Sequence, residues 1–197
     1  MNKRIAFFDF DGTITTRDTL LEFIKYSHGK RGFYWGFFIN SPYLFAYKLK
    51  IISNQRAKEK ILSHFFKGMK IEKFQDICDA FAKEIIPGLV RPRALEEINK
   101  LKSDGTTIIV VSASPHYWIS GWINQLQLQL IATQLEVEDG KLSGNISGKN
   151  CYGEEKVRRI KALYNLESFD EIIAYGDSSG DKPMLQLGTS YYKPFRH

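Results

Sequence analysis

Two aspartates, separated by one residue, follow a short apolar stretch near the N-terminus in the sequence Phe7-Phe8-Asp9-Phe10-Asp11-Gly12-Thr13. The apolar run Ile5–Phe8 predicts a short buried strand that ends at these acids. Carboxylates at the edge of a core are costly unless something compensates their charge. A bound cation together with a phosphate group would do so, and the pair Asp9 and Asp11 therefore indicates phosphate chemistry at a metal centre.

Three further polar motifs occur after predicted strands or loops. They are Ser112-Ala113-Ser114 after the strand Thr107–Val111, Lys156 after the loop 148–153, and Gly176-Asp177-Ser178-Ser179-Gly180-Asp181 after the strand Glu171–Tyr175. Active sites of open parallel sheets lie at the carboxyl ends of the strands. Singly, Ser112 could be a strand cap, Lys156 a solvated lysine and Asp181 a helix N-cap. Together the motifs predict one site.

The pattern of elements predicts how these motifs are brought together. Strands alternate with helices in the second half of the chain, which is typical of a mainly parallel sheet with helices on both faces. The intervening block shows helical patterns only, at Thr19–Ser27, Phe33–Ile39, Pro42–Ile51, Asn54–Phe66 and Ile71–Ile85. We therefore predict an α/β, Rossmann-like doubly wound core made of residues 1–14 and 87–197, with an all-helical cap, 15–86, inserted after the first motif.

In order, strand context and spacing, the four motifs resemble the haloacid dehalogenase superfamily of phosphatases. The helical block after the first motif is similar to that of its phosphoserine phosphatase-like subfamily. The resemblance implies Mg²⁺-dependent hydrolysis of a phosphate monoester through an aspartyl-phosphate, with Asp9 as nucleophile and Asp11 as general acid and base. Dehalogenases of this superfamily lack an acid at the position of Asp11, so the sequence favours phosphate esters over carbon–halogen bonds.

The same resemblance implies a set of binding residues. The metal ligands would be the carboxylates of Asp9 and Asp177 and the backbone carbonyl of Asp11, with Asp181 as a further ligand or a support. The expected phosphate- and substrate-binding residues are Phe10, Asp18, Ser112, Ala113 and Lys156. Lys156 would also balance the charge of the carboxylates and of the transferred phosphoryl group.

Departures from the subfamily pattern leave the substrate open. Asp18 stands where phosphoserine phosphatases carry a glutamate, and Arg56 is a candidate for their cap arginine. The first interpretation is a small organic phosphate such as a phosphoserine-like metabolite. The alternative is a lipid-phosphate phosphatase at the membrane interface, similar to phosphatidylglycerophosphate phosphatases. A non-catalytic phosphate-binding module is a minor third interpretation. His116 could contact substrate or be an ordinary solvated histidine.

The segment 33–52 is rich in aromatic residues and leaves two interpretations open. Asn40-Ser41-Pro42, Lys48 and Lys50 interrupt it, so it does not resemble a membrane span of about 18 apolar residues. It either forms the core of the cap or makes peripheral contact with lipid.

Composition restricts partners and compartment. The chain has 197 residues, a formal charge of +6 and a pI near 9.2, but its basic residues form no stripe, so we expect no nucleic-acid partner. Nothing in the sequence implies an obligate protein partner. Cys78 and Cys151 lack metal-ligand spacing, and the first apolar run is too short for a signal peptide. We expect a cytoplasmic protein.

Overall fold

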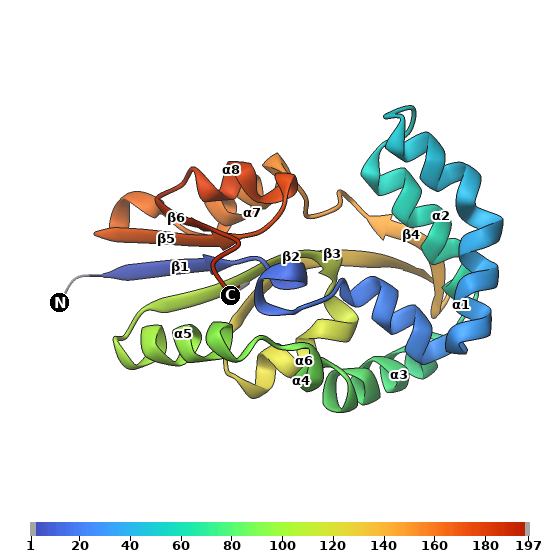
Figure 1. The fold of residues 1–197 in the computed structure, drawn as a ribbon, viewed down its shortest axis with the longest axis horizontal. Coiled ribbons are helices and arrows are strands. Elements are labelled where there is room, and N and C mark those ends of the chain that lie inside the picture. The colour runs from blue at the N-terminus through green and yellow to red at the C-terminus, as the bar shows by residue number, and fades with distance from the viewer. Residues whose placement is uncertain (1–2, 196–197) are drawn as a thin grey trace.

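A six-stranded sheet lies at the centre of the computed structural model, which describes residues 3–195 (Figure 1). Its strand order is β4-β3-β2-β1-β5-β6, and neighbouring strands run parallel except β3 and β4. The strands are β1 (Arg4–Phe8), β2 (Thr107–Pro115), β3 (Gln129–Glu138), β4 (Lys141–Ser147), β5 (Glu171–Gly176) and β6 (Thr189–Tyr192). The central position of β1 brings the first acidic motif between the carboxyl ends of β2 and β5.

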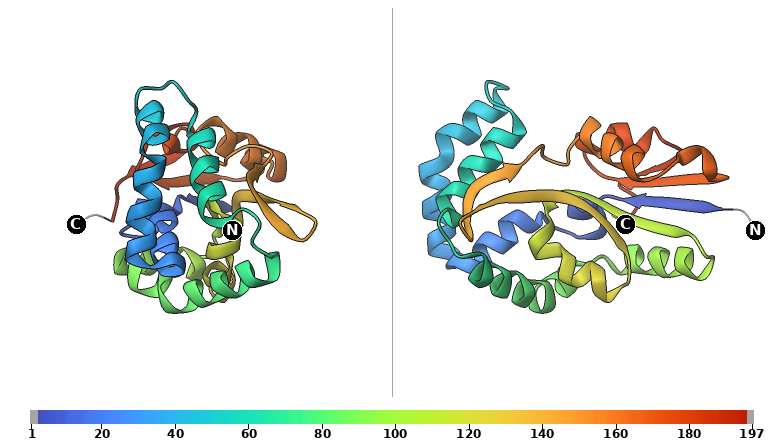
Figure 2. Two further views of the ribbon diagram at one scale, coloured as in Figure 1. Left: turned by 90° about the vertical axis from the view of Figure 1, so that its right-hand side faces the viewer. Right: turned by 180° about the vertical axis from the view of Figure 1, so that it is seen from behind.

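Helices cover both faces of this sheet (Figures 1 and 2). They are α1 (Thr19–Lys48), α2 (Asn54–Phe66), α3 (Ile71–Glu84), α4 (Ile86–Leu89), α5 (Pro92–Ser103), α6 (His116–Gln125), α7 (Glu154–Leu163) and α8 (Lys182–Leu185). The first five are inserted between β1 and β2, and α1 and α2 stand beyond the carboxyl ends of the central strands. Over residues 3–195, no helix combines the length and apolarity needed to cross a membrane.

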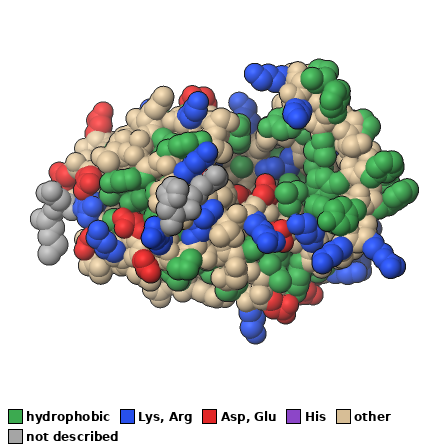
Figure 3. All heavy atoms as spheres, in the orientation of Figure 1, with side chains coloured by type: hydrophobic (Ala, Val, Ile, Leu, Met, Phe, Trp, Pro, Cys, Tyr) green, Lys and Arg blue, Asp and Glu red, His purple; other side chains and the backbone are tan. Residues whose placement is uncertain are grey.

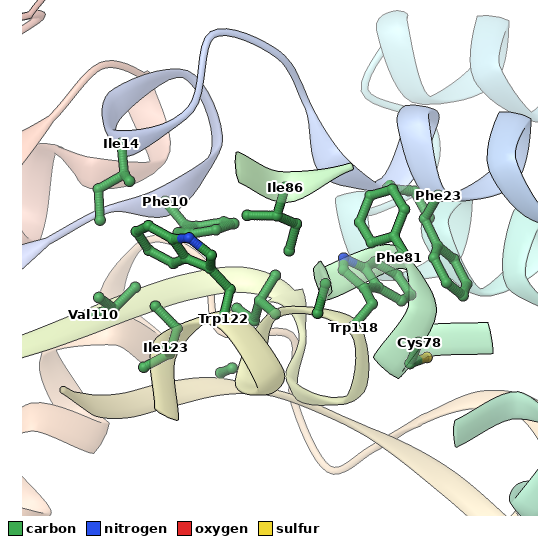
Figure 4. Packing of buried hydrophobic residues seen from close by; sticks show 14 of the residues in the cluster. Phe10, Ile14, Phe23, Cys78, Phe81, Ile86, Val110, Trp118, Trp122 and Ile123 are labelled. Carbon is green, nitrogen blue, oxygen red and sulfur yellow. The ribbon is translucent and has the colours of Figure 1, made fainter. Parts of the chain in front are cut away.

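The alternation of side chains along β1 builds two cores. Ile5 and Phe7 are fully buried on one face, where they pack with residues of α7 and α8. Ala6 and Phe8 face the larger core, which continues under the inserted helices. Figure 4 shows part of that core, with Phe23, Trp118 and Phe81 packed close together. A parallel sheet covered on both faces explains why its central strands are continuously apolar.

The predicted fold class is confirmed, whereas the domain limits 1–14, 15–86 and 87–197 stay a prediction. The predicted separation of Phe33–Ile39 from Pro42–Ile51 was wrong, because α1 continues through Pro42. Proline has no backbone N–H to donate to the carbonyl four residues earlier in a helix. In α1 the carbonyl that lacks this donor is that of Phe38, an exposed residue. Gly29, with φ of 69°, breaks the helical geometry between the predicted helices Thr19–Ser27 and Phe33–Ile39.

Candidate active site

A cavity of about 310 Å³ lies between the carboxyl edge of the sheet and the inserted helices, where Figure 3 shows the surface hollowed. Residues from all four predicted motifs line it. The complete lining is Asp9, Asp11, Asp18, Leu20, Tyr47, Asn54, Lys58, Ala113, Ser114, Tyr152, Lys156, Ser178 and Asp181. The topology thus brings together motifs that are up to 172 residues apart, from Asp9 to Asp181.

Lys156 joins the first and last motifs at the bottom of this cavity. Its Nζ donates to Oδ1 of Asp9 at 2.6 Å, to Oδ1 of Asp181 at 2.7 Å and to the carbonyl of Val111 at 2.7 Å. Lys156 and Asp181 are 1% exposed and Asp9 is 6% exposed. The three N–H donors of an ammonium group therefore all have acceptors, and the buried charges are paired.

Burial and charge set the protonation of this group. Burial raises the pKa of Asp9 to about 7, although Lys156 opposes the shift. Burial also disfavours the charge of Lys156, but the carboxylates of Asp9 and Asp181 outweigh it and hold the lysine pKa above its ordinary value. For Asp181 the effect of burial is outweighed by Lys156 and Ser178, so its pKa is lowered. Of Asp9 and Asp181, Asp9 is thus the carboxylate whose ionised form is disfavoured and would gain from a further cation.

Three carboxylates could provide that cation site. Oxygen atoms of Asp9, Asp177 and Asp181 all lie within 4.8 Å of one another. Hard oxygen donors are the ligands that Mg²⁺ prefers, so the residues present fit the expected metal. Gly12 keeps the space open, because it has φ of 83° and a Cβ at this position would overlap the carboxylate of Asp177. Asp11 was expected to bind the metal through its backbone carbonyl, and its carboxylate is not part of this group.

The side chain of Asp11 is held by three hydrogen bonds. Its Oδ1 accepts from the backbone N and the Oγ1 of Thr19 at 2.7 and 2.6 Å, and its Oδ2 accepts from Oγ of Ser114 at 2.6 Å. The indole N–H of Trp118 donates to Oγ1 of Thr19 at 3.2 Å. Thr19 and Ser114 were not among the predicted site residues. Ser114 is the last residue of the second motif and Thr19 directly follows Asp18, and these positions were the available signal.

The second motif lies in the wall of the cavity, and its two serines point in different directions. Ser114 and Ala113 line the cavity. Ser112 is fully buried, and its Oγ accepts a hydrogen bond from the backbone N of Ser114 at 2.9 Å. In this conformation Ser112 shapes the irregular end of β2 that presents its two neighbours.

Lys58 is the cation that the inserted helices bring into the cavity. Its Nζ donates to the carbonyl of Ala113 at 2.9 Å and to Oδ1 of Asn150 at 3.3 Å, and burial lowers its pKa. Arg56, the residue considered from sequence, is exposed on the same helix. Lys58 shares the inward face of α2 with Ala57 and Ile61, a helical spacing that could have identified it.

Asp18 lines the cavity and also begins α1. Its Oδ1 accepts from the backbone N of Leu20 at 2.9 Å and of Leu21 at 3.3 Å, as an N-cap does. Although the residue as a whole is exposed, partial desolvation of its carboxylate and the charge of Asp11 raise its pKa to about 6. One carboxylate oxygen is therefore committed to the helix, which leaves the other for a ligand.

Two other sequence candidates do not contribute side chains to the cavity. Phe10 is fully buried and faces Trp122 in the core (Figure 4), so a contact with phosphate would have to come from its backbone. His116 is half-buried at the start of α6 and is not part of the cavity lining. Tyr47 and Asn54, which do line it, were not among the predicted site residues.

Comparison with known proteins agrees with this geometry. Residues 6–186 match the family model of haloacid dehalogenase-like hydrolases. Protein CicA of Caulobacter vibrioides is 33% identical over 196 residues, which cover 96% of this chain and 85% of that protein.

Solved structures share the fold. A Bordetella pertussis protein of unknown function has a TM-score of 0.83 at 22% identity, covering 96% of this chain and 88% of that one. A phospho-aspartyl intermediate analogue of phosphoserine phosphatase has a TM-score of 0.63 at 26% identity, covering 95% and 84%.

Proposed function

Because the chain belongs to the haloacid dehalogenase-like hydrolases and is a phosphatase of this type with phosphoserine phosphatase-like relatives, we propose that it hydrolyses phosphate monoesters through a covalent phosphate on Asp9. The observation that carries the proposal is the buried Asp9–Lys156–Asp181 group at the bottom of the cavity. It supports a nucleophile whose position is fixed and whose carboxylate already has a cationic partner before substrate arrives.

The reaction divides into two displacements at phosphorus. A carboxylate oxygen of Asp9 attacks phosphorus, the ester P–O bond breaks, and protonated Asp11 gives its proton to the leaving alkoxide. Asp11 then takes a proton from water, the water oxygen attacks phosphorus, and the bond to Asp9 breaks to release inorganic phosphate. Thr19 and Ser114 orient Asp11 for both proton transfers.

Asp9, Asp177 and Asp181, with the backbone carbonyl of Asp11, would hold Mg²⁺. The ion would neutralise charge on the phosphate that otherwise repels the attacking carboxylate. Lys156 adds positive charge on the side of Asp9 and keeps this carboxylate from turning away.

The first candidate substrate is a small organic phosphate with further charged groups, such as a phosphoserine-like metabolite. Lys58 and Asp18 support it, because the cavity wall offers one cation and one anion besides the phosphate-binding residues. An amine and a carboxylate on the substrate would each meet an opposite charge there. The Lys58→Met variant should raise KM for such substrates more than for a plain aryl phosphate.

A second candidate is a phosphate monoester carried by a lipid. One observation favours it: Tyr47 belongs to the aromatic segment 33–52 and also lines the cavity. A phosphate-binding module without activity is disfavoured, because every group needed for the two displacements is present.

The test is turnover of an aryl phosphate. Asp9→Asn should abolish it, since an amide cannot attack phosphorus, and EDTA should abolish it until Mg²⁺ is restored. Asp139→Asn, in the exposed β3–β4 turn, is the matched control and should keep full activity. Undiminished turnover of Asp9→Asn would overturn the proposal.

A further inference from the structure

The outer face of the helical insert exposes large apolar side chains. This cap face consists of Tyr34, Trp35, Phe38, Ile39, Tyr43, Phe45, Leu49 and Ile51, which are between 42% and 71% exposed. In Figure 3, hydrophobic side chains gather at the right-hand end of the molecule, where α1 stands in Figure 1, with Lys and Arg beside them. Exposed apolar patches of this kind mark interaction surfaces.

Helical spacing explains why these residues are outside. Gly36 and Asn40 are buried, and Phe33 and Phe37 pack partly against the core, so the inward face of α1 is already complete. The residues between them, 34, 35, 38 and 39, point to solvent. Of the two interpretations of 33–52, the cap core accounts only for the inward positions, and the outward aromatics need another partner.

Charge identifies the kind of partner. Between Glu22 and Glu59 the chain has no Asp or Glu. It has Lys30, Arg31, Lys48, Lys50 and Arg56, besides Lys25, which pairs with Glu22, and Lys58, which lies in the cavity. A second copy of the chain would bring the same excess of positive charge against this one and be repelled. A surface that is both apolar and anionic would satisfy aromatic rings and lysines at once, as the headgroup region of an acidic bilayer does.

The cap face is also continuous with the mouth of the cavity. Asn54 donates from Nδ2 to the hydroxyl of Tyr47 at 3.2 Å, and both residues line the cavity. Tyr47 is 38% exposed and lies within the aromatic segment. A surface to which the cap face bound would therefore lie beside the entrance to the site.

We propose that the cap face docks the protein on an anionic lipid bilayer, with the aromatic rings at headgroup depth and the neighbouring lysines and arginines on lipid phosphates. Docking is separate from the reaction, since none of the eight residues takes part in phosphoryl transfer. The two inferences can therefore fail independently.

Flotation with vesicles tests the proposal. The protein should float with vesicles of phosphatidylglycerol and phosphatidylcholine at low salt. Binding should fall steeply at about 0.5 M NaCl, where the Debye length is only a few Å. Binding to pure phosphatidylcholine should be at least tenfold weaker. Absence of flotation at low salt, or equal binding to both vesicles, would overturn the proposal.

Variants locate the surface. Trp35→Ser with Phe38→Ser should weaken vesicle binding at least tenfold, and Lys48→Glu with Lys50→Glu should do the same. Leu163→Ser and Lys161→Glu alter exposed residues of α7 and should bind like the unaltered protein. Turnover of a soluble aryl phosphate should be unchanged in all four proteins, which shows that each is folded. Equal binding by all of them would contradict the assignment.

Tryptophan fluorescence gives a direct signal of docking. The chain has three tryptophans, of which Trp35 is 64% exposed while Trp118 and Trp122 are buried. Acidic vesicles should shift the emission to the blue through Trp35, and Trp35→Phe should lose the shift while still floating. A concentration-dependent dimer, detected by light scattering and dispersed by the Trp35→Ser, Phe38→Ser protein, would assign the face to a second copy and refute lipid docking.

Discussion

The hydroxyl of Ser114 donates a hydrogen bond of 2.6 Å to Oδ2 of Asp11, a residue 103 positions earlier in the chain. The same aspartate is held on its other oxygen by Thr19. The carboxylate is thus fixed from β2 and from the start of α1. Fixed orientation is what a group must have if it gives and takes a proton at one place.

Ser114→Ala should lower kcat for an aryl phosphate about fivefold, with little change in KM, because one hydrogen bond of about 1 kcal/mol orients Asp11. Steady-state kinetics at saturating Mg²⁺ measures this split. Ser103→Ala, at the exposed end of α5, removes a hydroxyl of the same kind far from the cavity and should change neither constant. A raised KM with unchanged kcat would instead make Ser114 a substrate-binding group.

Lys156→Met should destabilise the metal-free protein by about 3 kcal/mol or more, because it leaves Asp9 and Asp181 buried without their cation. Urea unfolding in EDTA measures the change. Mg²⁺ should restore part of the lost stability, since the carboxylates would then share a metal ion. Lys161→Met, on the exposed side of the same helix, should cost little in either buffer.

Much of this site could be predicted from local sequence patterns. Apolar strands ending in Asp9 and Asp177 were visible from sequence because buried parallel strands are continuously apolar and their polar ends stand out. Helical spacing could place Lys58 on the inward face of α2 but could not show that this face reaches the site, which depends on the packing of the insert on the sheet. The exposure of Trp35 and Phe38 was equally hidden, since both faces of α1 are apolar there and only the fold decides which one is covered.

Glu155→Gln should lower stability at neutral pH by about 1 kcal/mol. Oxygen atoms of Glu155 accept from Arg158 at 2.7 and 2.6 Å and from Arg159 at 2.8 Å, and the hydrogen bonds from Arg158 are the main cause that lowers its pKa from 4.5 to about 2.

A lowered carboxylate pKa contributes stability that is complete above the pKa of the unfolded chain. The contribution of Glu155 should therefore be present above about pH 4.5 and disappear as the pH falls towards 2. Thermal unfolding across this range should show the variant and the unaltered protein converging. Glu138→Gln, at the exposed end of β3, is the control. A constant difference at every pH would contradict the prediction.

Gly36→Ala should loosen the insert by about 1 to 3 kcal/mol. Gly36 is buried where α1 crosses α2, and a Cβ there would overlap the ring of Phe65. Relief requires the ring of Phe65 to be displaced or the two helices to separate, and separation would move Lys58 away from Ala113, to which it donates at 2.9 Å. Gly88→Ala is the matched control, because Gly88 is exposed in α4 and a Cβ there meets nothing within 4 Å. The Gly36 variant should unfold at lower urea concentration and show a raised KM for a charged organic phosphate, whereas the Gly88 variant should show neither change. Equal stability of the two variants would contradict the prediction and mean that the contact between Gly36 and Phe65 does not hold α1 and α2 together.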